Sequence, residues 1–180
     1  MGLVRGAVAT AAAAAALVVG FGLVRAPSPA GSVAFAGDLR KGGRLEELRL
    51  PELEGDGIVE YASYSDRPLV INFFASWCPS CRAEMPEFER VYTRLGDRVA
   101  FLGVSQSDAR SASAALAEET GISYDTAIDG RGEFFRAIGG LGMPTTVFIR
   151  PGGEIAEVWV GPLDARTLRG LIADDLGVVP

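Results

Sequence analysis

Residues 69–86 of this 180-residue chain are LVINFFASWCPSCRAEMP. The first six residues, Leu69 to Phe74, are apolar apart from Asn72, which is typical of a strand that is covered on both faces and therefore central in its sheet. From Pro79 to Leu95, apolar residues recur at positions 81, 85, 88, 91, 92 and 95, a spacing that predicts a helix with one buried stripe. Pro79 suits the first turn of that helix. A buried strand that leads directly into a helix is therefore expected.

The rest of the sequence predicts further strands and helices, which together form one domain over residues 48–180. The expected elements are a hairpin of strands at 48–53 and 58–61, a strand at 99–104, helices near 108–119 and 133–138, a second hairpin of strands at 145–149 and 154–160, and a last helix from an Asp164 cap to Leu176. We expect Trp159 in the core of the second hairpin. This order predicts an α/β fold with a mixed central sheet flanked by helices.

Composition excludes several kinds of chemistry. The chain has no histidine and only two cysteines, which rules out a Ser/His or Cys/His relay, an imidazole metal site and a four-thiolate zinc site within one chain. We therefore expect no metal and no cofactor. The 23 acidic and 17 basic residues give a net charge of −6, so binding to nucleic acid is not expected.

The two cysteines, Cys78 and Cys81, follow the predicted strand and open the predicted helix. Residues three apart on a helix have Cβ atoms ~5–6 Å apart, which is close to disulfide geometry. Free backbone N–H groups and the positive end of the helix dipole favour the thiolate of Cys78, so we expect it to be the nucleophile. Cys81 lies one turn further, in line with the apolar stripe, and is expected to resolve the mixed disulfide.

Other roles for the cysteine pair have weaker support. A structural disulfide normally closes a much larger loop, because its stabilisation grows with loop length. Haem attachment needs a histidine after the second cysteine, where this chain has Arg82. Zinc or an iron–sulfur cluster would need thiols from another subunit. The spacing therefore favours redox catalysis.

The amino-terminal segment predicts export. Residues 6–24, GAVATAAAAAALVVGFGLV, are nineteen residues without a charge, long enough for a helix that crosses a bilayer once. Residues 1–25 are thus expected to be a signal anchor that holds the domain at the cell membrane, or a signal peptide that is cleaved after Ala36 and leaves the domain secreted. Residues 26–47, rich in Pro, Gly and Ser, are expected to be a flexible tether. The basic residues that follow this segment outnumber those before it and favour the opposite orientation, but redox chemistry favours the extracytoplasmic side.

Two motifs carry a resemblance to a known family: residues 72–86, NFFASWCPSCRAEMP, and residues 142–146, GMPTT, before a predicted strand. Over about residues 48–176, the chain resembles the thioredoxin superfamily and, within it, the extracytoplasmic TlpA/ResA-like branch. The resemblance implies a cis peptide before Pro144, placed against the two sulfurs, and a Met143 backbone that pairs with an extended substrate segment. We also expect Trp77 to pack over the cysteine motif and shape the docking surface, although core packing accounts for Trp77 equally well.

Some residues depart from the pattern of cytoplasmic thioredoxins. Asn72 stands where those proteins have a buried Asp beneath the cysteines, and an amide cannot accept the proton of the resolving thiol. Glu84 matches a carboxylate of the TlpA/ResA branch, and we expect it to accept that proton, with its pKa raised by partial burial; a solvated helix residue is the alternative. The spacer residues Pro79 and Ser80 supply no cation for a thiolate, which speaks against a very strong oxidant.

Together these features predict an exported thiol–disulfide oxidoreductase. We expect it to reduce disulfides and to take electrons from a membrane-embedded thiol carrier, since the sequence has no second cysteine pair. The resemblance implies that its clients are exported cysteine-containing proteins, including cytochrome c precursors. Three alternatives stay open: an exported oxidant that introduces disulfides, a thiol peroxidase as in the related peroxiredoxins, and a non-catalytic binding module.

Overall fold

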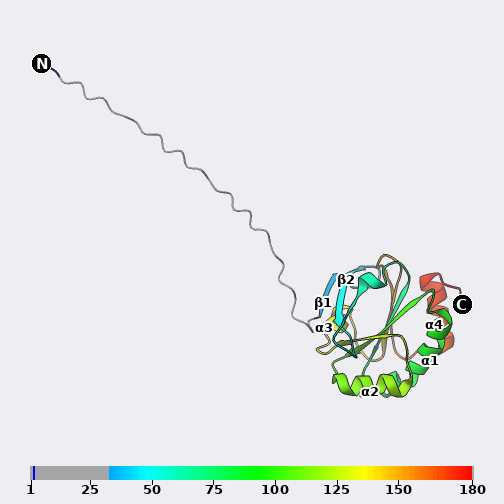
Figure 1. Cartoon of the computed structure of the whole chain (residues 1–180). Coiled ribbons are helices and arrows are strands. Elements are labelled where there is room, and N and C mark those ends of the chain that lie inside the picture. The colour runs from blue at the N-terminus through cyan, green and yellow to red at the C-terminus, as the bar shows by residue number, and fades with distance from the viewer. Residues whose placement is uncertain (1, 3–32, 180) are drawn as a thin grey trace.

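The computed structural model describes Gly2 and residues 33–179, and the two ends of the folded part are seen in Figure 1. The strands are β1 (Ala34–Asp38), β2 (Arg44–Pro51), β3 (Ile58–Glu60), β4 (Leu69–Phe74), β5 (Ala100–Gln106), β6 (Asp125–Asp129), β7 (Thr145–Ile149) and β8 (Ile155–Val160). The helices are α1 (Pro79–Leu95), α2 (Arg110–Thr120), α3 (Glu133–Ala137) and α4 (Ala165–Leu176), with a 3-10 turn η1 (Tyr61–Ser63) after β3.

The strand β4 lies at the centre of a five-stranded sheet with the order β6-β5-β4-β7-β8. It runs parallel to β5 and antiparallel to β7, so the sheet is mixed. All of its residues are buried, because layers cover both faces of the sheet. The predicted central strand from Leu69 to Phe74 and the mixed α/β sheet are therefore confirmed.

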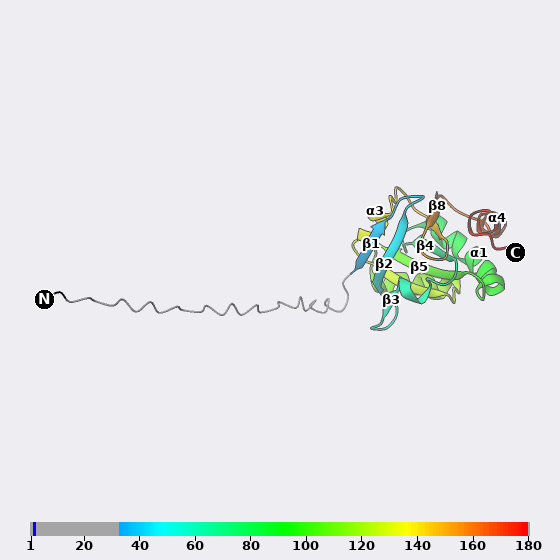
Figure 2. The same ribbon diagram turned by 90° about the horizontal axis from the view of Figure 1, so that it is seen from above.

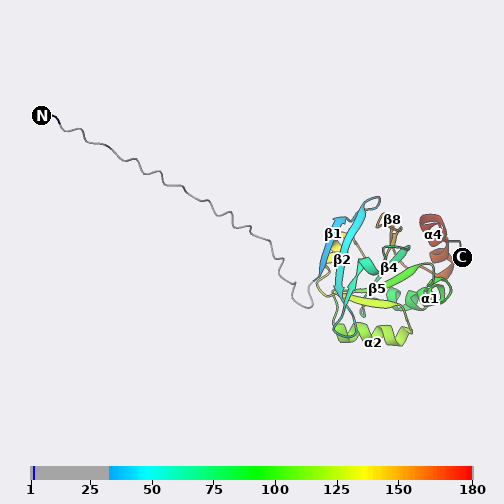
Figure 3. The same ribbon diagram turned by 45° about the horizontal axis from the view of Figure 1, so that its top comes forward.

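Different layers cover the two faces of this sheet (Figure 2). Helices α1 and α4 share one core with Val70 of β4, and α2 packs near α1, with Leu116 in a cluster that contains Phe74 (Figure 3). On the other face, α3 and the antiparallel sheet β1-β2-β3 share a core with Phe73. Since side chains alternate along a strand, Asn72 of β4 faces the same layer as Val70, which is the layer of α1.

The predicted flexible tether over residues 26–47 is wrong from Ala34 onward. Residues 34–38 form β1, which pairs with β2, and Leu39 and Leu45 are buried in the core. The sequence conceals β1 because its residues are mostly small and only partly buried, without an apolar alternation. The antiparallel pairing of β2 with β3 confirms the first predicted hairpin.

Two other differences concern the edges of the larger sheet. The sequence does not predict β6, because polar residues surround Ala127 and Ile128; parallel pairing with β5 specifies this strand. Trp159 is exposed and not in the hairpin core, because burial falls along the edge strand β8 from Ile155 to Val160. The last helix begins as predicted, with the Asp164 side chain as its cap.

The predicted hydrophobic helix of residues 1–25 lies outside the described residues, apart from Gly2. Among the helices that the structure describes, none has the length and apolar composition that a bilayer crossing requires. The candidate cleavage position after Ala36 falls within β1.

Candidate active site

The cysteine pair forms a disulfide at the amino terminus of α1. The Cα atoms of Cys78 and Cys81 are 5.3 Å apart, so the helix start brings the sulfurs together as their spacing predicts. Cys78 is the N-cap residue, and its sulfur accepts a hydrogen bond from the backbone N–H of Cys81 at 3.1 Å. Cys78 is 4% exposed and Cys81 0%. Both cysteines are thus buried, and Cys81 completely, in agreement with its expected shielding.

The Met143–Pro144 peptide bond is cis, as the resemblance implies. The preceding loop forms a groove of about 450 Å³ with the start of α1. Residues from four parts of the chain line this client groove: Trp77, Cys78, Pro79, Ser80, Gln106, Phe135, Leu141, Gly142 and Met143. Most of the surface is apolar, and none of these side chains carries a charge. The groove therefore offers an uncharged, largely apolar surface beside Cys78.

Trp77 and Leu141 are large apolar side chains of this client groove that are exposed, at 56% and 91% exposure. Core packing is therefore the wrong account of Trp77. Its indole N–H donates to the carbonyl of Ser107 at 3.4 Å, which holds the ring against the connection between β5 and α2. An aromatic ring that is exposed yet fixed suits a contact surface.

Glu84 lies one turn after Cys81 and is buried, with 2% exposure. Its two carboxylate oxygens accept hydrogen bonds from the Asn72 side-chain amide at 2.8 Å and from the backbone N–H of Leu163 at 3.0 Å. Burial raises the pKa of Glu84 to about 7, although both hydrogen bonds favour the charged form and oppose the shift. The expected partial burial and raised pKa are thus present, and the alternative of a solvated helix residue is wrong.

The Glu84 carboxyl also borders a second groove, of about 470 Å³, between α1 and the segment that leads into α4. Its other lining residues include Glu87, Pro162 and Asp164. The Glu84 side chain is thus buried in the fold but lies at the edge of a solvent-accessible groove. A carboxyl with a pKa of about 7 beside such a groove can take up or release a proton near neutral pH.

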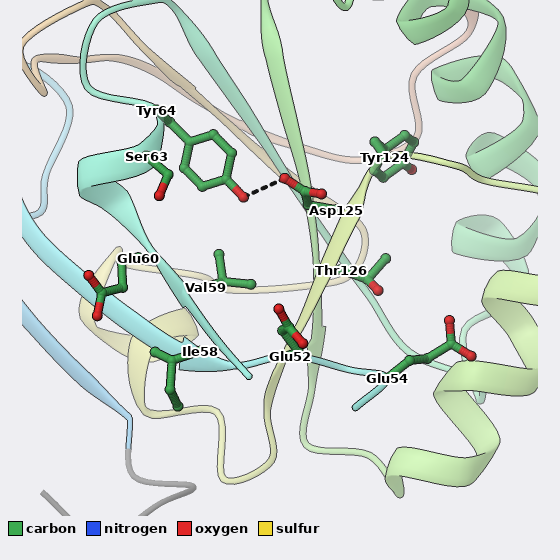
Figure 4. A pocket seen from close by; sticks show the side chains of 10 residues that line it. All are labelled: Glu52, Glu54, Ile58, Val59, Glu60, Ser63, Tyr64, Tyr124, Asp125 and Thr126. Atoms are coloured by element: carbon green, nitrogen blue, oxygen red, sulfur yellow. Dashed lines mark hydrogen bonds between the residues drawn. The ribbon is translucent and has the colours of Figure 1, made fainter. Parts of the chain in front are cut away.

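A further cavity, of about 400 Å³, lies between β3, η1 and β6 (Figure 4). Four carboxylate residues line it, and the Tyr64 hydroxyl donates to Asp125 at 2.7 Å. This cavity shares no lining residue with the client groove and contains no thiol.

Residues 42–158 match the model of the AhpC/TSA family. The chain belongs to this family. A thiol-disulfide oxidoreductase ResA of Oceanobacillus iheyensis is 31% identical over 129 residues, which are 71% of this chain and 61% of the relative. A thiol:disulfide interchange protein DsbE of Pseudomonas fluorescens is 31% identical over 128 residues, 70% of each chain. A DsbF homologue of known structure from Corynebacterium diphtheriae is 26% identical, with a TM-score of 0.65, and the match covers 81% of this chain and 94% of that one.

The family match and these relatives confirm the expected place in the thioredoxin superfamily, near ResA, and the expected enzyme class, a thiol–disulfide oxidoreductase. Among the residues with a predicted part in the site, the structure gathers five around the client groove: Trp77, Cys78, Pro79, Ser80 and Met143. Pro144 is buried next to Met143, and Cys81 and Glu84 are buried residues of α1 that do not line the groove.

The sequence did not indicate Gln106, Phe135 or Leu141 as residues of this site. A signal was available for Leu141, which is an isolated apolar residue in a glycine-rich segment directly before Met143. Gln106 and Phe135 carry no such signal, because they reach the client groove only through the arrangement of β5 and α3. The backbone contact from Leu163 to Glu84 spans 79 positions and could not be inferred from local patterns.

Proposed function

We propose that this family member reduces disulfides of exported proteins outside the cytoplasm. One observation carries the proposal: a disulfide between Cys78 and Cys81 at a helix amino terminus opens on an uncharged, largely apolar groove. Such a surface accepts polypeptides with exposed apolar residues, which are typical of unfolded clients. The direction is supported by the lack of a cation around Cys78 among the described lining residues, because a very strong oxidant needs a strongly stabilised thiolate.

In the proposed reaction, the thiolate of Cys78 attacks one sulfur of a client disulfide. A mixed disulfide forms, and the other client sulfur leaves as a thiolate. Glu84 then accepts the proton of the Cys81 thiol, and the Cys81 thiolate attacks the sulfur of Cys78. The intramolecular disulfide closes and the second client thiolate leaves, so that two electrons pass from the cysteine pair to the client. A Glu84 carboxyl with a pKa of about 7 is suited to take this proton near neutral pH.

The client is held, in this proposal, by backbone pairing at Met143 beside Pro144 and by apolar contacts with Trp77 and Leu141. Exposure of both side chains in the oxidised state leaves them available to a partner. Clients are exported cysteine-containing proteins, and the resemblance to the TlpA/ResA-like branch includes cytochrome c precursors among them. Electrons reach the spent disulfide from a membrane-embedded thiol carrier, because this sequence has no second cysteine pair.

Residues 1–25 anchor the domain to the cell membrane in this proposal. Signal-peptide cleavage after Ala36 is the less favourable form, because it would remove part of β1 and its pairing with β2. In the anchored form the whole three-stranded sheet stays intact. Fractionation of cells that make the full chain tests this point, since an anchored protein sediments with membranes and resists salt and alkaline extraction.

An exported oxidant is the competing function, and thiol trapping in the cells that make the protein separates the two. Acid quenching followed by alkylation should find the Cys78–Cys81 pair mainly reduced. A mainly oxidised pair would instead support the oxidant. The same experiment on a Cys78→Ser variant provides the control for the alkylated species, because this variant cannot form the disulfide.

A further inference from the structure

The two residues before Cys78 are both fixed to the connection between β5 and α2. The carboxylate of Asp108 accepts a hydrogen bond from the backbone N–H of Ser76 at 2.6 Å and another from the Ser76 hydroxyl at 3.0 Å. The neighbouring carbonyl of Ser107 accepts from the Trp77 indole at 3.4 Å. The position of the segment just before Cys78 is therefore fixed by hydrogen bonds to residues 107–108 and not only by helix α1.

Asp108 is itself anchored to buried parts of the fold. It accepts two more hydrogen bonds, from the backbone N–H of Ala109 at 2.8 Å and from the Ser113 hydroxyl at 2.7 Å. The hydroxyls of Ser113 and Ser105 share a hydrogen bond at 2.5 Å, and both residues are fully buried. Burial raises the pKa of Asp108, but the hydrogen bonds from Ser76 and Ser113 outweigh it and hold that pKa below its usual value. The carboxylate is thus ionised and fixed in place.

The next residue towards β5 is also constrained. Ser107 has a φ of +48°, in the left-handed region that residues with a Cβ rarely adopt. Its backbone N–H donates to the Asp129 carbonyl at 3.1 Å. The buried Asp129 carboxylate in turn accepts from the backbone N–H of Phe135, a residue of the client groove, at 2.9 Å. Both walls of the client groove are therefore tied to residues 107–108, and backbone strain of this kind concentrates at functional sites.

We propose that Asp108 is a positioning residue for disulfide exchange, which fixes Ser76 and Trp77 and thereby holds the sulfur of Cys78 at the amino terminus of α1. The inference rests on the exchange reaction proposed above. A role confined to the start of α2 would explain the hydrogen bonds of Asp108 to Ala109 and Ser113. It would not explain two hydrogen bonds to Ser76, which belongs to a different segment 32 positions earlier.

The direction in which the pKa of the Cys78 thiol shifts when Asp108 is removed distinguishes a positioning role of Asp108 from a purely electrostatic one. If Asp108 holds Cys78 near the free N–H groups of α1, its loss moves the sulfur away from them and raises the pKa of the thiol. If Asp108 acted only as a nearby negative charge, its loss would lower that pKa. The other charged groups near the helix start stay unchanged in the comparison: Glu84 on α1, and Arg82, which pairs with Glu119 of α2.

The test compares Asp108→Ala with a matched control, Glu89→Ala. Glu89 of α1 also accepts hydrogen bonds from the N–H and the hydroxyl of one serine, Ser123, at 2.8 and 2.7 Å, but Ser123 does not precede a cysteine. Three quantities are measured on the reduced full chain: the pH midpoint of iodoacetamide alkylation at Cys78, the rate of reduction of a disulfide-bonded peptide, and the thermal midpoint of unfolding.

We expect Asp108→Ala to raise the alkylation midpoint by about half a pH unit or more and to slow peptide reduction about tenfold, since small misplacements of a reacting atom are costly. Glu89→Ala should lower the thermal midpoint while it leaves the other two quantities unchanged. An alkylation midpoint that falls or stays constant in Asp108→Ala overturns the proposal, as does an equal slowing in both variants.

If Asp108→Ala does not fold, the pair Ser76→Ala and Ser76→Thr answers the same question. Alanine removes the hydroxyl that donates to Asp108, and threonine keeps it. Threonine should retain the wild-type rate and alanine should lose part of it, whereas equal rates would refute the inference. Failure of the unsubstituted chain to reduce the peptide would instead refute the proposed exchange function.

Discussion

Substitution of Glu84 by glutamine probes the buried carboxyl directly, since it keeps the size of the side chain and removes its charge. Burial raises the pKa of Glu84 from 4.5 to about 7 in the folded chain. Between these two values the folded state keeps a proton that the unfolded state loses, so the stability of the unsubstituted chain falls as the pH rises. Each pH unit over which the folded state keeps this proton and the unfolded state does not lowers the free energy of unfolding by about 1.4 kcal/mol. The free energy of unfolding of the unsubstituted chain therefore falls by about 2–3 kcal/mol between pH 5 and pH 8.

Glu84→Gln removes this pH dependence but leaves one of two buried hydrogen-bond donors without an acceptor. The Asn72 amide and the Leu163 N–H both donate to the carboxylate, whereas glutamine offers one acceptor oxygen. A buried donor without a partner costs about 1–3 kcal/mol. The variant should thus be less stable than the parent at pH 5 and should equal or exceed it at pH 8.

Urea unfolding of the oxidised chain at both pH values measures this change. Glu118→Gln on α2 is the matched control, because Glu118 is exposed and its substitution should leave the difference from the parent the same at both pH values. A stability gap between Glu84→Gln and the parent that does not narrow from pH 5 to pH 8 would refute the argument from burial.

The same variant tests the proposed proton transfer. Loss of a general base typically slows the step it serves by about 10²- to 10⁴-fold, so the closure of the mixed disulfide by Cys81 should slow by at least about 10²-fold near pH 8. The rise of the rate around pH 7 should disappear. Stopped-flow measurement of peptide reduction across pH 5 to 9 reports both effects, and an unaltered profile would exclude Glu84 as the proton acceptor.

Three further substitutions test other parts of the description. Cys81→Ser should trap a mixed disulfide between Cys78 and a client, seen as a reducible band on a non-reducing gel; rapid peroxide consumption by this variant would point to the thiol peroxidase instead. Leu141→Asp should raise the KM for a peptide with an apolar residue beside its cysteine about tenfold, since burial of such a side chain is worth about 1.5–3 kcal/mol, and should spare the rate with a small dithiol. A similar loss with both substrates would contradict the apolar contact. Leu45→Ala should lower the free energy of unfolding by about 2–5 kcal/mol in a urea titration, because Leu45 is buried in the core; a loss under about 0.5 kcal/mol would place residues 34–47 outside the domain.

The local pattern of the chain was sufficient for the chemistry of the cysteines. The run from Leu69 to Phe74 and the helical stripe after Pro79 depend on neighbours within a few positions, so periodicity alone located β4 and α1. The same local geometry joined Cys78 to Cys81. The cis bond before Pro144 and the burial of Glu84 were expected only through the resemblance, because neither follows from periodicity.

Tertiary structure alone determined what surrounds the disulfide. Strand β1 has no apolar alternation of its own, and β6 is polar at both ends; each exists through pairing with a neighbouring strand. Burial by distant parts of the chain raises the pKa of Glu84, and the Leu163 hydrogen bond that opposes this shift spans 79 positions. The hydrogen bonds that fix Ser76 come from Asp108, beyond the end of β5. Short-range periodicity reports which residues a segment buries, but hydrogen bonds between distant segments arise only when the sheet brings those segments together.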